Sequence, residues 1–242
     1  IQGFDMDKYV GQSLVGDAIV TDASVLNLGT SERTFDGITP EIKKELETMD
    51  GILEVHNVYF TKCNVKLSQK AKEGFNSFVE KYPEYFAETY AQQELASLKE
   101  DVIPWNDVYG VDSWGMEQLG HYKGELDWEK FKTGNYCFIN TFGLSWELEE
   151  PLLGMYCDVG DKLSIELPDG TMKEYEVMAI GDMPYPMTNR CFSFLGMQVI
   201  LPQQECLKFM DSEGALMSVL IQEKDSGLPI LLLLHQGLLL LA

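Results

Sequence analysis

The residues best suited to chemistry are three histidines, His56, His121 and His235, which stand far apart in the sequence. None of them belongs to an HExxH or HxH arrangement with acidic neighbours, the spacings that bring two imidazoles to one metal ion. The spacing therefore favours ordinary surface or partly buried imidazoles over metal ligands. We expect no metal site.

Pairs of carboxylates are a second class of reactive groups. Asp5 with Asp7, and Glu149 with Glu150, could serve general acid–base chemistry or bind calcium. Among 39 acidic residues such adjacency is expected by chance, and the DxDxDG loop typical of calcium sites is missing. The sequence also lacks a GxSxG elbow, a P-loop and a GxGxxG turn. We therefore expect neither an enzyme nor a bound cofactor; an extracellular hydrolase with unrecognised carboxylates is the weaker alternative.

Aromatic side chains gather in the stretch that follows Asp101. Trp105, Tyr109 and Trp114 stand close together there, among turn-forming residues. They could line a cleft for a peptide or a sugar, and they are our candidates for a ligand or partner surface. The favoured alternative places them in the core and at its rim, because each large aromatic side chain buries about 150–250 Å² and usually anchors packing.

The net charge of −21 over 242 residues is the strongest global signal. Such a field repels nucleic-acid phosphates and anionic lipid headgroups, and it attracts cationic peptides or metal ions. We therefore expect no nucleic-acid partner. With 45% hydrophobic and 11% aromatic residues, the composition is that of a globular protein.

Five cysteines occur without a CxxC pair: Cys63, Cys137, Cys157, Cys191 and Cys206. An odd number leaves at least one free thiol unless a bond forms between chains, so this is not the disulfide framework of a small secreted domain. Cys137 and Cys191 lie within apolar stretches and are expected to be small buried hydrophobes. The disulfide state of the five is left open by the sequence.

No segment of the sequence reads as a complete membrane span. The chain opens IQGFDMDKYV, without the basic region and apolar run of a signal peptide. Residues 228–242 are rich in leucine, but His235, Gln236 and Gly237 interrupt them, and a span needs about 20 apolar residues. We therefore expect either a soluble protein or a module of a larger membrane protein.

The clearest structural element is a hairpin within the stretch from Asp158 to Asp182. Residues 163–167 alternate apolar and polar side chains, and the alternation resumes from Tyr175, a pattern typical of strands with one buried face. The sequence between them, Pro168-Asp169-Gly170, favours a tight turn. Proline fixes its own φ, aspartate can bond the backbone, and glycine accepts a left-handed conformation.

A β-α-β unit is predicted near the start of the chain. A first strand ends near Asp22, a helix begins at Thr39-Pro40-Glu41 behind a hydroxyl cap, and a strand follows at 52–65. A similar pattern comes late in the chain, where strands at 192–201 and 215–222 flank a short helix that opens at Pro202. Further predicted elements are helices at 69–82, after Pro83 (with Ala91, Leu95 and Leu98 inward) and at 128–132, and a strand at 136–139.

Several segments together resemble one family. They are Phe4–Tyr9, Asp17–Asn27, MDGILEVHNVYF (residues 49–60), KGELDWEKFKTGNY (residues 123–136), and VGDKLSIEL followed by KEYEVMAI (residues 159–180). Their order and spacing, from near Phe4 to about Gln222, are similar to those of the MacB-like periplasmic core domain. This is the extracytoplasmic domain of FtsX-like, MacB-type permeases of ABC transporters, here in its Gram-positive form.

The resemblance implies an α+β fold with two lobes. A β-α-β porter-like lobe would be built from both chain ends, residues 1–100 and 183–227, and a mixed α/β lobe containing the hairpin, residues 101–182, would be inserted. In the family a charged amphipathic helix follows the last strand. Residues 228–242 form instead a low-complexity, leucine-rich tail, which we do not expect to belong to the folded domain.

The resemblance also implies a function without catalytic residues. Such domains stand on the extracellular face of the cell membrane, between membrane helices, and couple ATP hydrolysis by a separate cytoplasmic ATPase subunit to an extracellular substrate or partner. Implied roles are export of, or resistance to, antimicrobial peptides, or the handling of lipoproteins or the cell wall. The expected partners are therefore the ATPase, an extracellular peptide, lipoprotein or cell-wall protein, and a second permease in a dimer. The alternative is a secreted or lipid-anchored ligand-binding protein with an aromatic cleft.

Overall fold

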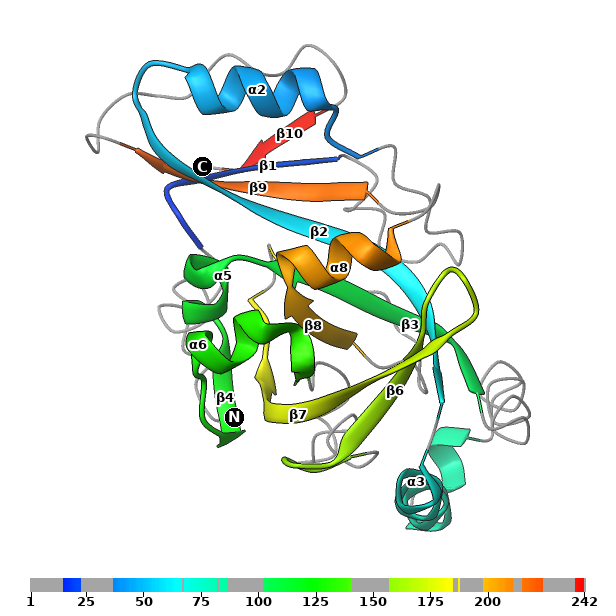
Figure 1. Ribbon diagram of the computed structural model, residues 1–242. Coiled ribbons are helices and arrows are strands. Elements are labelled where there is room, and N and C mark those ends of the chain that lie inside the picture. The colour runs from blue at the N-terminus through cyan, green and yellow to red at the C-terminus, as the bar shows by residue number, and fades with distance from the viewer. Residues whose placement is uncertain are drawn as a thin grey trace, which may run out of the picture.

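The fold is a mixed α/β arrangement with one large sheet and short helices on its faces (Figure 1). The computed structural model describes residues 15–22, 37–66, 68–81, 83–86, 102–140, 157–184, 187, 198–210, 215–223 and 238–241. The sheet contains both parallel and antiparallel pairs. The predicted α+β fold class, with helices and strands together, is confirmed.

The strands are β1 (Ala18–Asp22), β2 (Ile52–Lys66), β3 (Val102–Val111), β4 (Gly120–Gly124), β5 (Tyr136–Asn140), β6 (Lys162–Glu166), β7 (Met172–Asp182), β8 (Gln198–Pro202), β9 (Ala215–Glu223) and β10 (Leu238–Leu241). The helices are α2 (Pro40–Thr48), α3 (Gln69–Lys81), α5 (Ser113–Glu117), α6 (Trp128–Lys130) and α8 (Gln203–Phe209), with shorter helical segments at η2 (Pro83–Phe86) and η4 (Phe131–Asn135). None of the helices in the described ranges has the length and apolar character of a membrane-spanning segment.

The longest described strand, β2, belongs to two groups of strands at once. Its first part, Ile52 to Phe60, pairs with β9, and its second part, Tyr59 to Lys66, pairs with β3. In Figure 1 it runs as a cyan ribbon from α2, past α8, toward α3. The middle of the strand, residues 58–61, is β-branched or aromatic at every position and buried without a break. Such residues favour extended backbone, and here they pack on both sides of the strand.

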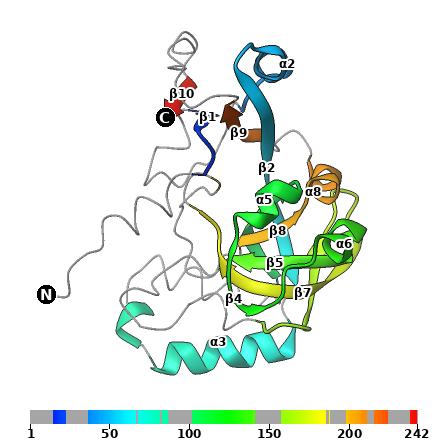
Figure 2. The ribbon, with the colours of Figure 1, turned by 90° about the vertical axis from the view of Figure 1, so that its left-hand side faces the viewer.

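The first group of strands, here called the chain-end sheet, consists of β10, β1, β9 and the first part of β2. Strand β1 is antiparallel to both β9 and β10, so the first and last described strands are neighbours. Helix α2 covers one face (Figure 2) and buries Leu46 completely. The helix begins where predicted: the Thr39 hydroxyl accepts a hydrogen bond from the Ile42 backbone N–H at 3.4 Å, and Pro40 opens the first turn.

The second part of β2 takes part in a closed ring of strands, here called the ring. The order is β2, β3, β8, β5, β7 and β6, and β6 returns to β2 where Ile165 lies opposite Val65. The predicted hairpin forms β6 and β7, with Leu163 opposite Tyr175 and with Gly170 at φ 81° in the turn. The hairpin therefore closes the ring.

Two apolar clusters lie on opposite faces of these strands. The first contains side chains from every strand of the ring, and α8 covers it with Cys206 and Phe209. Its members from the ring are Tyr59, Cys63, Val65, Val108, Cys137, Ile139, Leu163, Ile165, Tyr175, Val177, Ile180, Val199 and Leu201. The second cluster joins Phe60 and Phe138 to Met116 of α5 and Phe131 of η4. Because neighbouring side chains on a strand point to opposite faces, one set of strands supplies both layers.

Strands β3, β4 and β10 and helix α5 were not predicted from the sequence. Strand β3 contains Pro104, which disfavours a regular strand because it lacks a backbone N–H. The proline falls where the register with β2 shifts, between Ile103 opposite Val65 and Asn106 opposite Cys63, so an irregularity accommodates it. Residues 238–241 of the leucine-rich tail pair with β1, although no folded structure was expected there.

Three further expectations from the sequence stay predictions. The helix expected after Pro83, beyond η2, and the start of the strand expected at 192–201 lie outside the described residues. The proposed boundary at residue 183 puts β8 and α8 with the chain ends, whereas β8 pairs with β3 and β5 of the ring. The division into two lobes stays a prediction.

The buried thiols provide a test of this core. Cys63, Cys137, Cys157 and Cys206 are buried. Burial, followed by the nearby Asp161 and Asp158, raises the pKa of Cys157 to about 12. In a Cys191→Ser variant, which removes the thiol outside the described residues, we expect no reaction with Ellman's reagent at about pH 8, because only thiolates attack it. All the remaining thiols should react in concentrated guanidinium chloride. Rapid labelling of the folded variant would contradict the buried placement.

Candidate functional site

The structure describes the side chains of two of the three aromatic residues that were predicted to form a surface, Tyr109 and Trp114. Tyr109 has no exposed area and packs against Phe60, with ring centroids 5.4 Å apart. It is therefore part of the core and does not line an accessible surface. Trp114 is half-buried on α5, and Trp105 lies in β3, where its side chain is outside the described set. A binding role for the two tryptophans stays a prediction.

Trp114 leads to a polar cluster, here called the His56 cluster, made by His56, Asp112, Trp114 and Gln222. The rings of His56 and Trp114 stack with centroids 4.3 Å apart and planes 14° apart. Nδ1 of His56 lies 2.8 Å from Oδ2 of Asp112, and Nε2 lies 3.3 Å from Oε1 of Gln222. His56 is only 7% exposed, so these contacts replace the water that would otherwise solvate its ring.

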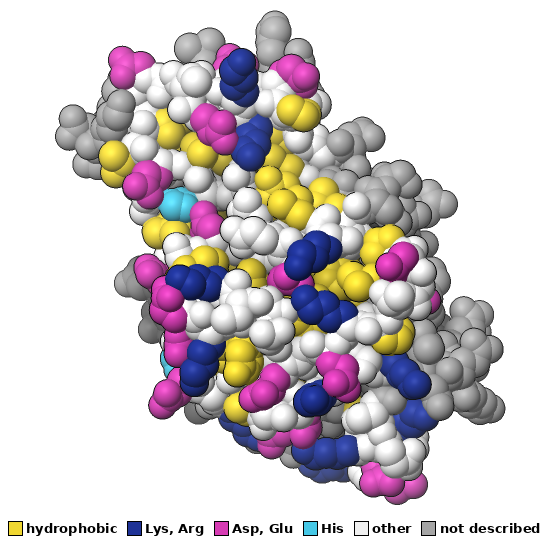
Figure 3. Space-filling model, viewed as in Figure 1, with side chains coloured by type: hydrophobic (Ala, Val, Ile, Leu, Met, Phe, Trp, Pro, Cys, Tyr) yellow, Lys and Arg dark blue, Asp and Glu magenta, His cyan; other side chains and the backbone are white. Residues whose placement is uncertain are grey.

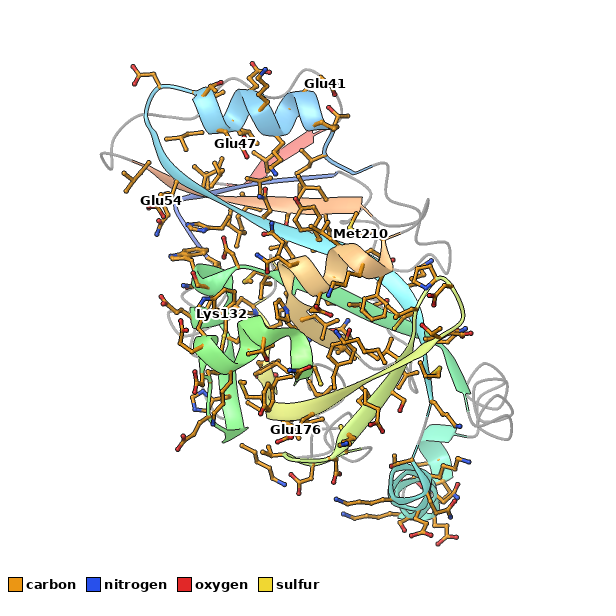
Figure 4. All side chains as sticks on the ribbon, in the orientation of Figure 1. Glu41, Glu47, Glu54, Lys132, Glu176 and Met210 are labelled. Atoms are coloured by element: carbon orange, nitrogen blue, oxygen red, sulfur yellow. The ribbon has the colours of Figure 1, made fainter. Side chains whose placement is uncertain are left out.

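The His56 cluster sits where three elements meet. His56 belongs to β2, Gln222 belongs to β9, and Asp112 is the N-cap of α5. The second carboxylate oxygen of Asp112 accepts a hydrogen bond from the Gly115 backbone N–H at 2.8 Å. Figure 4 labels Glu54, also on β2, at the edge of the molecule between α2 and α5. The carboxylate of Asp112 thus caps α5 and also attaches this helix to β2, the strand shared by the chain-end sheet and the ring.

A His–Asp contact of this length is also found in acid–base catalysis, where the carboxylate orients the imidazole. In that chemistry the other ring nitrogen faces a hydroxyl, a thiol or a water. Here, Nε2 faces the amide of Gln222, with a carboxylate oxygen of Glu54 at 3.7 Å. The arrangement is therefore suited to holding β2, β9 and α5 together.

A second charged cluster, here called the Glu205 cluster, joins α8 to the ring. Glu205, whose side chain is 7% exposed, forms ion pairs with Lys173 of β7 and Lys208 of α8. The Tyr175 hydroxyl donates a hydrogen bond to the same carboxylate at 3.2 Å. In Figure 3, dark blue lysine side chains lie on both sides of an acidic group near the centre of this face.

The environment of this carboxylate decides its charge. Burial acts to raise the pKa of Glu205, but hydrogen bonds from Lys173 and Lys208 outweigh burial, so the pKa lies below its usual value. Burial, and then the negative charge of Glu205, raise the pKa of Tyr175. At neutral pH the cluster therefore consists of a charged carboxylate, two lysines and a neutral phenol that donates its proton.

Of the remaining reactive residues, the structure describes only His121. His121 is exposed on β4, while His235 and the pairs Asp5/Asp7 and Glu149/Glu150 lie outside the described ranges. Across the described residues, no three side chains among histidine, cysteine, aspartate and glutamate converge as metal ligands.

Sequence reasoning missed both clusters. Asp112 followed by Gly115 is a recognisable N-cap signal, so α5 could have been placed. The other polar members of the cluster, His56 and Gln222, are 56 and 110 residues away from Asp112 along the chain. No local pattern identifies Glu205, because Lys173 comes from the hairpin and not from α8.

Comparison with known proteins gives structural matches only. No family model and no curated protein matches the sequence. Among solved structures, the chain is similar to the extracellular domain of the noncanonic ABC-type transporter YknZ from Gram-positive bacteria, with a TM-score of 0.44 and 11% identity over 87% of this chain and 85% of that one. It is also similar to the periplasmic region of MacB from Actinobacillus actinomycetemcomitans, with a TM-score of 0.45 and 8% identity over 88% of this chain and 76% of that one.

Two glycines allow a test of the packing around Glu205. Gly134 and Gly170 both have left-handed φ values, 75° and 81°, but a Cβ at Gly134 would overlap the Glu205 carboxyl group, whereas at Gly170 nothing lies within 4 Å. We expect Gly170→Ala to lower the free energy of unfolding by about 1–2 kcal/mol from backbone strain alone. Gly134→Ala should cost about 1–3 kcal/mol more, because of the overlap. Equal losses in chemical denaturation would contradict the described contact.

The charge of Glu205 predicts a dependence on acid. Because its pKa is lowered in the folded state, its contribution to stability is present above the unfolded value and is lost as the pH falls below about 4.5. We expect Glu205→Gln to destabilise the protein by about 1–2 kcal/mol at neutral pH, since Lys173 and Lys208 are partly exposed. The difference from the unsubstituted protein should shrink between pH 5 and pH 3 in denaturant titrations. A difference that is constant with pH would show that the charge contributes nothing.

Proposed function

We propose that this chain is the extracytoplasmic domain of an ABC transporter permease and that it transmits movement without catalysing a reaction. The sequence segments that resemble MacB-type permeases support the assignment to this class of protein. The proposal places the domain on the extracellular face of the cell membrane. There it would act with a cytoplasmic ATPase subunit, through the membrane helices of the permease, and with a second permease copy.

The observation that carries the proposal is the position at which the chain enters and leaves the fold. Ala18, the first residue of β1, lies opposite Ile221 near the end of β9, and the Asp17 backbone N–H donates to the Ile221 carbonyl at 2.8 Å. Leu241, at the end of β10, lies opposite Ile19. The described chain therefore enters and leaves at one end of the chain-end sheet (Figure 2). A domain inserted between two membrane helices requires neighbouring ends of this kind.

The shared strand supports a mechanical role. Strand β2 is hydrogen-bonded to β9 in the chain-end sheet and to β3 in the ring. Packed protein interiors have low compressibility and transmit strain. A displacement imposed on the chain-end sheet from the membrane would therefore reach the ring through a continuous strand and not through a flexible linker.

The net charge supports one substrate class within this proposal. A net charge of −21 favours cationic ligands, which agrees with the export of, or resistance to, antimicrobial peptides; lipoprotein or cell-wall handling is the other role within this proposal. The alternative is a ligand-binding protein with an aromatic cleft. Tyr109 is buried and cannot line such a cleft, so this alternative rests on Trp105 and Trp114 alone.

Labelling of the full-length protein in intact cells tests the location. Met172, which is 46% exposed in the hairpin, would be changed to cysteine in the Cys191→Ser background. We expect a membrane-impermeant maleimide to label this variant without lysis, and the Cys191→Ser parent to stay unlabelled because its described thiols are buried. Labelling that requires lysis would overturn the extracytoplasmic placement.

Spin labels test the coupling separately. Leu53, 59% exposed on β2, would carry the label in the permease purified with its ATPase. We expect the distance between the labels of a dimer to differ between the nucleotide-free and ATP-trapped states. An unchanged distance would contradict mechanical coupling and leave the location intact.

A further inference from the structure

The His56 cluster has a property that its structural role alone does not require: its hydrogen bonds depend on a proton. A neutral imidazole carries one N–H, and its other nitrogen is an acceptor, whereas an imidazolium donates from both nitrogens. In the structure both nitrogens of His56 face oxygen atoms, Oδ2 of Asp112 at 2.8 Å and Oε1 of Gln222 at 3.3 Å. Only the protonated ring can donate to both.

The other groups around the imidazole of His56 are also suited to a positively charged side chain. Oε2 of Glu54, whose side chain is 63% exposed, lies 3.7 Å from Nε2. Trp114 covers one face of the ring, and the electron-rich face of an indole attracts cations. Two charged side chains contact His56 within the described residues, Glu54 of β2 and Asp112 at the cap of α5, and both are acidic. Strand β9 contributes the neutral amide of Gln222. Glu117, the other acid of α5, is exposed.

Loss of the proton changes the contact of at least one ring nitrogen. The neutral ring can keep its bond to Asp112, but then Nε2 becomes an acceptor facing an oxygen. The cluster is satisfied again only if the Gln222 amide turns to present its NH₂ group, and the attraction to Glu54 is lost. Asp112 also caps α5. Any weakening of the hydrogen bond between Asp112 and His56 therefore weakens the attachment of the first turn of that helix to β2.

We propose that protonated His56 is a latch that holds α5 against β2 and β9, and that loss of its second ring proton releases the helix while the ring of strands stays folded. The latch lies at the junction between the chain-end sheet and the ring. The protonation state of His56 therefore determines how strongly α5 is attached to β2. The inference concerns the isolated domain and does not depend on the proposed transport function.

Hydrogen exchange of the α5 backbone amides tests the latch. We expect protection of residues 113–118, corrected for the intrinsic effect of pH, to fall about tenfold between pH 5.5 and pH 8, the range in which histidines change charge. Amides of β5 in the ring should show no such change. Constant protection of α5 across this range would overturn the proposal.

Three variants assign the effect to the proton on His56. His56→Gln, which stays neutral at every pH, should remove the pH dependence, and His121→Gln, at the exposed histidine of β4, should leave it intact. Asp112→Asn keeps a side chain that caps helices as well as aspartate does but removes the carboxylate, so it should also remove the dependence. A dependence that survives in His56→Gln would overturn the latch.

A spectroscopic readout keeps the proposal testable if His56→Gln does not fold. Long-range ¹H–¹⁵N spectra of the unsubstituted protein distinguish an imidazolium from either neutral tautomer. We expect His56 to pass from the doubly protonated to a singly protonated ring over the same pH range in which α5 loses protection. A ring that keeps one protonation state while the exchange of α5 changes would contradict the mechanism.

Discussion

The structure depends on one backbone constraint, the sharing of β2 between two sets of strands. A strand has two hydrogen-bonding edges, and each edge can serve one partner at each position. Strand β2 uses its length to serve several: β9 along its first part, β3 along its second part, and β6 at its end. The chain-end sheet and the ring therefore cannot be displaced from each other by rotation about a single linker, because hydrogen bonds fix both to one continuous strand.

Polar groups attach the helices to this frame at specific points. Asp112 joins α5 to β2, and Glu205 joins α8 to β7 through Lys173. Both acids are held by groups that compensate for burial, as partly or fully buried charges require. The apolar clusters stabilise the packing of the helices, but the hydrophobic effect is not directional. The hydrogen bonds and ion pairs of Asp112 and Glu205 join specific atoms, and they therefore fix the position of each helix. They are therefore the positions at which a change in protonation or in side chain would act on a single helix and leave the sheet intact.

Local patterns predicted the elements whose structure is determined locally. The hairpin of β6 and β7 follows from alternation and a turn at Gly170, and the start of α2 follows from Thr39 and Pro40. Strand β3 was missed because Pro104 and Gly110 resemble a turn, and only pairing with β2 and β8 explains its extended backbone. The His56 cluster could not be predicted, since it requires the register in which His56 lies opposite Leu220 of β9. The burial of Tyr109 likewise depends on which face of β3 meets Phe60.

The burial of β2 also limits where the molecule can move. Residues 58–61, where the strand passes from β9 to β3, are buried side by side, and bending there would disturb both apolar clusters at once. Close-packed interiors resist such deformation, and small shifts are taken up at interfaces between packed elements. Helices α2, α5 and α8 each contact β2 from outside the hydrogen-bonded frame. Movement that leaves the frame intact must therefore occur at the contacts of these helices, and for α5 that contact is made by His56 and Asp112.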